Sequence, residues 1–239
     1  MNLLKTRIEF REFFLIAISF IVFTIIGTLS HEYGHIIVAK YLGYETKLHY
    51  GSMTFKGNND KLINDIYFRN KFAITNNKNY SEKEHYDQLI EKTHSDSLAI
   101  NIGGPIQTIV TGTIGFILLL YRSKLIYRNG LKILDWIYIF LSLFWLRQVF
   151  NLVMSIGNAI YKSNNNYFGG DERRIASALE IHEGSLAIPL AIFGLFITIY
   201  IVFKIIPLEK RLNFILGGLC GGILGFFIWL RFLGQILLP

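Results

Sequence analysis

Charged residues are scarce in this sequence, and long hydrophobic runs take their place. Only 17% of the 239 residues are Asp, Glu, Lys or Arg, whereas 52% are hydrophobic. A soluble globular domain carries about 25% charged residues, so this composition excludes an ordinary soluble protein. We therefore expect an integral multi-pass protein embedded in the lipid bilayer of the cell membrane.

Cysteine is scarce as well, and dense basic stretches are missing. The single cysteine, Cys220, excludes a disulfide within the chain. The formal net charge is +7, but no run of Lys and Arg is dense enough to bind DNA or RNA, so we expect no nucleic-acid partner. Loops that face anionic lipid headgroups explain the positive charges better.

Five apolar segments exceed the roughly 20 residues that a helix needs to cross a bilayer core. They lie at about residues 12–42, 98–121, 133–159, 184–206 and 211–237. The predicted fold class is therefore an all-α polytopic membrane protein with about five transmembrane helices. Residues 1–172 would form the core, and residues 173–239 would add the last two helices. A glycine cluster between residues 217 and 225 predicts close helix packing.

A polar segment, residues 43–97, separates the first two apolar segments. Residues 46–55 have β character, and residues 65–75 could pair with them across the Gly-Asn-Asn-Asp turn at 57–60. Further along, a capping-box pattern predicts a short helix over residues 82–95. The expected polar segment thus contains a small β-hairpin followed by a helix.

The most informative run closes the first apolar segment, from His31 to His35, and reads His-Glu-Tyr-Gly-His. On a helix, residues four apart share a face, so the two imidazoles can hold one zinc ion. Glu32 beside them can act as a general base on a metal-activated water. Gly34 allows another backbone to pass close by. The pattern predicts a hydrolytic metal site at the membrane, and the alternative is a histidine pair that binds no metal.

A catalytic zinc usually takes three protein ligands, so a third is needed. If the five spans alternate, the His-Glu run, a Gly-Gly-Pro run in the second span and the loop after residue 159 meet on one side of the membrane. We choose Asp171 as the third ligand, because two glycines before it permit a tight approach. It could also merely cap a helix over residues 172–181. Other candidates on that side are Glu172, Glu180, His182, Glu183, His49, His85 and His94.

Three patterns resemble the motifs of the site-2 proteases, which are intramembrane zinc metalloproteases. The His-Glu run continues to Ala39 and Gly43 and resembles the family's first motif, HExGHxxxAxxxG. Gly104-Pro105 is similar to its Gly-Pro motif, and Asp171 corresponds to the aspartate of its third motif. Many members carry a PDZ domain, and no segment of this chain could hold one.

The resemblance implies a zinc metalloendopeptidase that hydrolyses peptide bonds of a membrane protein or peptide substrate. Zn²⁺ would be held by His31, His35 and Asp171, with Glu32 as the general base. Gly104 and Pro105 would help position the substrate, as would Thr108, which stands where the family commonly has Asn. Residues 46–55 could also take an extended substrate as an extra strand.

A polar group in the third span, formed by Arg147, Gln148 and Asn151, has two interpretations. Asn151, one turn from Arg147, could point into the site and hold a substrate backbone or an oxyanion. Otherwise the group forms structural bonds between helices, which we favour.

Two rival functions remain. The chain could be a non-proteolytic metal-binding membrane protein, such as a transporter or an inactive scaffold. It could also be an enzyme of the same fold that acts on a substrate other than protein. Glu32 separates the first rival from a protease, because only a hydrolytic enzyme needs it for turnover.

Overall fold

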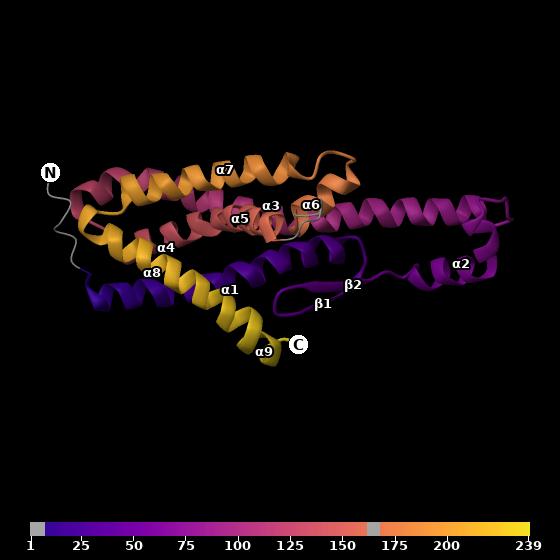
Figure 1. Ribbon diagram of the computed structural model, residues 1–239, viewed down its shortest axis with the longest axis horizontal. Helices are drawn as coiled ribbons and strands as arrows, with labels where there is room; N and C mark the ends of the chain where they lie inside the picture. The colour runs from indigo at the N-terminus through magenta and orange to yellow at the C-terminus, as the bar shows by residue number, and fades with distance from the viewer. Residues whose placement is uncertain (1–7, 162–167) are drawn as a thin grey trace.

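The computed structural model describes residues 8–161 and 168–239. Within these ranges, five helical segments are long and apolar enough to cross a membrane. They are Phe10–Tyr41, Lys83–Asn129, Ile133–Tyr161, Gly184–Ile205 and Leu208–Leu237. Each overlaps one of the five apolar segments of the sequence. Four of them run along the long axis of the molecule, and Leu208–Leu237 crosses it obliquely (Figure 1).

Several of these segments are built from more than one helix. The first two are the single helices α1 (Phe10–Tyr41) and α3 (Lys83–Asn129). The third contains α4 (Ile133–Ser142), the 3₁₀ turn η1 (Leu143–Trp145) and α5 (Leu146–Tyr161). The fourth joins α7 (Gly184–Tyr200) to the π-helical η2 (Ile201–Ile205), and the fifth joins α8 (Leu208–Phe227), η3 (Ile228–Leu233) and α9 (Gly234–Leu237). A short helix, α6 (Gly170–Ala178), packs against α3 and α7.

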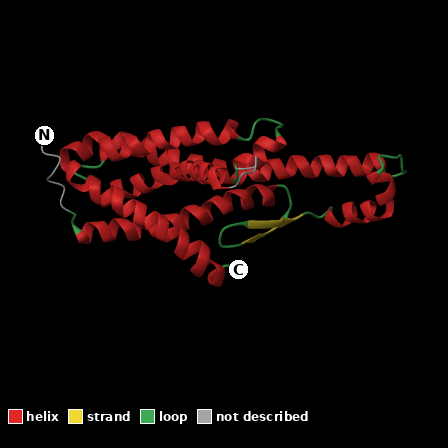
Figure 2. Ribbon diagram, viewed as in Figure 1, coloured by secondary structure: helices red, strands yellow, loops and turns green. Residues whose placement is uncertain are grey.

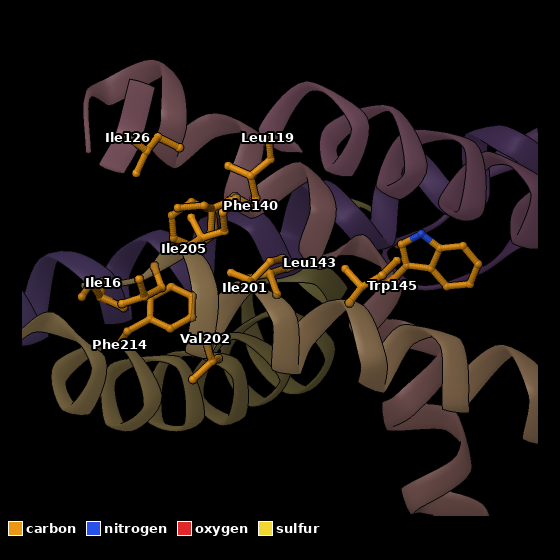
Figure 3. Close-up of a cluster of buried hydrophobic side chains, with 13 residues drawn as sticks. Ile16, Leu119, Ile126, Phe140, Leu143, Trp145, Ile201, Val202, Ile205 and Phe214 are labelled. Atoms are coloured by element: carbon orange, nitrogen blue, oxygen red, sulfur yellow. The ribbon is translucent and has the colours of Figure 1, made fainter. Parts of the chain in front are cut away.

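The hydrophobic core lies toward the end of the molecule that contains the start of α1. There Ile16 of α1, Leu119 of α3 and Ile139 of α4 belong to one buried cluster. Ile201 of η2 and Phe214 of α8 complete it from the last two segments (Figure 3). At 3.6 residues per turn, Ile16 and Leu119 are about four turns away from His31 and Gly104, so this apolar cluster lies apart from the His-Glu run.

Helices α1 and α8 pack closely because α8 presents small residues to its neighbour. Gly217, Gly221 and Gly225 are buried and recur every four residues, so they share one face. A Cβ atom at Gly221 would lie 2.3 Å from the carbonyl oxygen of Ala17. The close packing predicted from the glycine cluster is confirmed.

The β-hairpin is shorter than predicted, and its predicted second strand is a helix. Strand β1 (Glu45–Leu48) pairs antiparallel with β2 (Met53–Lys56), and the His49 N–H closes the turn by donating to the Ser52 carbonyl oxygen, 2.9 Å away. The hairpin therefore occupies the first predicted strand and one further residue at each end, and it is the only sheet among the described residues (Figure 2).

Residues 65–75, predicted as a strand, belong to helix α2 (Asp60–Thr75). Its inward-facing residues Ile63, Ile66 and Ile74 recur at helical spacing, and Ile66 is fully buried. A strand would have turned the half-buried Tyr67 and Ala73 away from the face that carries Ile66. The apolar periodicity therefore outweighed the β character of the local composition.

The helix predicted over residues 82–95 is not separate from the second span. It is the first part of α3, a single helix of 47 residues, which at 1.5 Å per residue is about 70 Å long. A bilayer core is only about 30 Å thick, so one part of α3 extends well beyond it. Helix α2 folds back along this part, held by an Arg69–Glu82 ion pair of 3.0 Å, and the two form a projecting arm (Figure 1).

A hydrogen bond fixes the chain where it leaves α1. The Tyr44 hydroxyl donates to Asp96 Oδ2 on α3 over 2.9 Å. Burial and the neighbouring Asp96 raise the pKa of Tyr44 to about 12, so the hydroxyl keeps its proton at neutral pH. The end of α1 is thereby held against α3 close to the His-Glu run.

Gly221→Ala should destabilise the protein, because the new methyl group meets the backbone of α1. Overpacking of this kind costs about 1–3 kcal/mol. We expect a lower midpoint of thermal unfolding for the detergent-solubilised variant. Gly222→Ala is the matched control, because a Cβ there has no atom within 4 Å. Equal midpoints for the two variants would contradict the proposed contact.

Candidate metal centre

The two histidines of the motif lie on the buried face of α1. His31 is 1% exposed and His35 is 5% exposed. Next to them α1 and α3 come close together: a Cβ at Gly34 would lie 2.5 Å from the Gly103 carbonyl oxygen, and a Cβ at Gly103 would lie 2.5 Å from that of Gly34. The close approach predicted for Gly34 is confirmed, and it places the imidazoles against α3.

Helix α3 orients both imidazole rings through their Nδ1 atoms. His35 Nδ1 lies 2.7 Å from the carbonyl oxygen of Ile100, which can only accept, and this contact is shorter than the 3.3 Å to the Gly104 N–H, so we assign the proton to Nδ1. His31 Nδ1 lies 2.8 Å from Thr108 Oγ1, which can accept in the same way. Both Nε2 atoms are then free to act as ligands, the arrangement that metal-binding histidines usually have.

Asp171 joins the two histidines from the first turn of α6. Its Oδ2 lies 2.8 Å from His31 Nε2 and 3.4 Å from His35 Nε2, and the two Nε2 atoms are 3.3 Å apart. Two ligands of a tetrahedral zinc ion, each about 2.0–2.1 Å from the metal, are about 3.3 Å apart. The three atoms therefore have nearly the spacing of a zinc ligand set, and Asp171, predicted as the third ligand, lies in the same group as the histidines.

The charge of Asp171 suits a cation. Burial alone would raise the pKa of Asp171, but the neighbouring imidazoles of His31 and His35 outweigh burial and hold it below the usual range. Asp171 is therefore a carboxylate at neutral pH. A group of two imidazoles and one carboxylate can hold a divalent metal ion, and it matches the donors of catalytic zinc sites.

The alternative role of Asp171 as a helix cap is wrong. Helix α6 starts at Gly170, Gly169 takes the N-cap position, and no side chain caps the helix. Gly170 has a φ of +78°, a conformation that favours glycine, and so turns the chain immediately before Asp171. The side chain of Asp171 is directed to the histidines instead.

Glu32 lies beside the metal group without being part of it. It is buried, and it makes no hydrogen bond to any residue that the structure describes. It interacts electrostatically with His35, Arg147 and Asp171. A carboxylate in this position is available to exchange a proton with a bound ligand.

Gly104 forms the wall of the metal group opposite α1. A Cβ there would lie 2.2 Å from His35 Nε2 and 2.6 Å from His31 Nε2. Pro105 follows it in the buried part of α3. In this structure Gly104 makes room for the ligand atoms and Thr108 contacts His31, so both act on the metal group; their predicted roles toward substrate stay predictions.

Helix α5 meets α6 beside the metal group. Asn151 Nδ2 donates to Glu172 Oε2 over 3.3 Å, which is a bond between helices of the kind we favoured. Glu172 is only 2% exposed, and burial raises its pKa. Its other oxygen, Oε1, has no hydrogen-bond partner among the described residues. Sequence spacing could not link these residues, because they are 21 positions apart.

The other candidate ligands lie elsewhere. His49 contacts the backbone oxygen of Pro239, His182 accepts from the Gly184 N–H, and Glu183 pairs with Arg173. Within residues 8–161 and 168–239, the metal group contains only His31, His35 and Asp171. The remaining candidates outside it are Glu172, Glu180, His85 and His94.

No protein-family model, curated protein or solved structure matches this chain. The chemistry of the site is therefore inferred from its own groups: two imidazoles and a carboxylate that converge, and a second carboxylate that is free beside them. These are the groups that metal-assisted hydrolysis requires.

Gly104→Ala should abolish tight metal binding, because its methyl group would displace both Nε2 atoms. Metal content of the purified protein, measured by mass spectrometry after dialysis, should fall well below that of the wild type. Gly157→Ala serves as the control, since a Cβ at Gly157 has no atom within 4 Å. If Gly104→Ala retains as much metal as this control, the ligand set is wrong.

Proposed function

We propose that this protein is an intramembrane zinc metalloprotease that hydrolyses peptide bonds of membrane protein substrates in the cell membrane. One observation carries the proposal: His31, His35 and Asp171 converge with the spacing of a zinc ligand set, beside a free Glu32, on a helix apolar enough to cross a membrane. Site-2 proteases, which the motifs resemble, have this chemistry.

The depth of the site along α1 supports hydrolysis within the membrane. Between Glu12 and Lys40, the only acidic or basic side chains of α1 are those of the His-Glu run. At 1.5 Å per residue, His35 lies roughly 8 Å from Lys40. The reacting groups therefore lie inside the apolar part of the helix, near one of its ends. Ionisable groups at such a depth are costly and generally serve a function.

Each residue of the site has a separate role in hydrolysis. A zinc ion in this site would act as a Lewis acid, polarising the scissile carbonyl and lowering the pKa of water. Glu32 takes a proton from the attacking water and passes it to the leaving amine, so one carboxylate serves as base and then as acid. Thr108 and the Ile100 carbonyl keep both imidazoles in the tautomer that binds metal.

A substrate helix has to unwind before its backbone can be attacked, because its peptide groups are hydrogen-bonded to each other. The β1–β2 hairpin packs against the end of α1 and has free edges that could receive an extended segment. Its turn is anchored to the end of the chain, where Trp229 Nε1 donates to the Tyr50 carbonyl oxygen over 2.6 Å. An anchored hairpin could hold such a segment in a fixed position.

Glu32→Gln should remove turnover and spare the metal, because the amide cannot take a proton from water. General acid–base catalysis contributes about 10²–10⁴-fold, and we expect a loss of that size. Wild-type and variant proteoliposomes are incubated with a total membrane-protein extract, and new peptide termini are identified by mass spectrometry. Zinc is measured on the same preparations.

Glu91→Gln, a change at an exposed carboxylate on the projecting part of α3, is the control and should cleave like the wild type. Identical termini from wild type and Glu32→Gln would indicate a transporter or an inactive scaffold. Turnover of non-protein substrates alone would indicate the other rival, an enzyme of different specificity.

A further inference from the structure

Arg147 is a half-buried cation whose role the catalytic scheme above leaves open. It lies at the start of α5, inside a helical segment apolar enough to span a membrane. Its Nε atom is buried without a hydrogen-bond partner, and no described carboxylate lies within 4.0 Å of the guanidinium. A charged group inside a membrane protein normally faces a partner or a cavity, so an unpaired one indicates a missing ligand.

Arg147 lies close to the reacting groups. It interacts electrostatically with His31, with Glu32 and with Glu172. These three residues come from α1 and α6, so Arg147 approaches the metal group from a third helix. Arg147 is therefore near enough to the ligand set and the general base for its charge to act on them.

Glu172 offers the complementary hydrogen-bonding group on the same side. Its Oε1 is buried without a partner in the described chain, while Asn151 holds its Oε2. A peptide unit presents one carbonyl oxygen and one N–H, and both lose their partners when a substrate helix unwinds in an apolar environment. The unpaired Nε of Arg147 and the unpaired Oε1 of Glu172 match these two needs.

We infer that Arg147 contacts the substrate, donating a hydrogen bond to the carbonyl oxygen of the peptide unit under attack, while Glu172 receives an N–H of the same unwound segment. The inference rests on the proposed proteolytic function and adds a substrate-binding wall from α5 and α6. Negative charge grows on that carbonyl oxygen as water attacks, so the bond from Arg147 strengthens in the transition state and accelerates the reaction.

The test uses a peptide that the wild type cleaves in a Glu32-dependent manner, identified from the membrane-protein extract. Arg147→Gln should lower kcat by about 10²-fold or more, the loss that follows removal of one donor to an oxyanion. KM should change little, and zinc content and the thermal midpoint should equal those of the wild type. Arg147→Lys keeps the positive charge but lacks the planar set of N–H donors of the guanidinium, so its kcat should fall less than that of Arg147→Gln. Arg69→Gln on the exposed arm is the control.

The outcomes distinguish a failure of the proposed proteolytic function from a failure of the role inferred for Arg147. If the wild type makes no Glu32-dependent cleavage, the proposed function fails and this inference fails with it. If the wild type cleaves and Arg147→Gln keeps its kcat, only the inference is overturned. It is also overturned if both Arg147→Gln and Arg147→Lys lose zinc or thermal stability, since Arg147 would then be part of the scaffold.

Discussion

The close approach of α1 and α3 at Gly34 and Gly103 is the constraint on which the site depends. Any side chain at either position would meet the backbone of the other helix at 2.5 Å. Because the two backbones come this close, the Ile100 carbonyl and the Thr108 hydroxyl reach the Nδ1 atoms of the two imidazoles. The same contact brings Gly104 against their Nε2 atoms, where there is no room for a side chain larger than the hydrogen of glycine.

The bundle separates packing from chemistry along its length. Apolar side chains from all five apolar segments fill the end that contains Ile16 and Phe214. In lipid, helices are held by such packing and by hydrogen bonds rather than by the hydrophobic effect, so a dense apolar end supplies the association energy. The opposite end can then carry buried polar groups that are held rigidly but are not all satisfied. Arg147, Gln148 and Glu172 are among the residues with such unpaired buried atoms.

Much of this arrangement could be predicted from the sequence, and the failures have physical reasons. The apolar segments and the spacing of His31 and His35 are local patterns, and the structure retains both. Asp171 was harder, because its position depends on the docking of α6 against α3, far away in the chain. The contact between Asn151 and Glu172 arises from the same docking, and no local spacing encodes it.

In the polar segment, a local pattern led to a wrong prediction. Residues 65–75 contain Ile, Tyr and Phe, which favour strands, yet their apolar residues recur with helical period and bury one face of α2. Periodicity reports which face is buried, so it was the better guide here. The prediction that Asp171 could cap the helix was also wrong. Gly170 makes the turn before the helix, and the carboxylate of Asp171 is free to contact the histidines.

The metal content of detergent-purified protein tests the central claim most directly. Wild type, His35→Ala and Asp171→Ala are compared after removal of loosely bound ions. The wild type should contain about one zinc ion per chain, and both variants should lose it, because each removes one of three ligands. Full zinc occupancy in Asp171→Ala, or a folded and active wild type that contains no metal and is indifferent to chelators, would contradict the account.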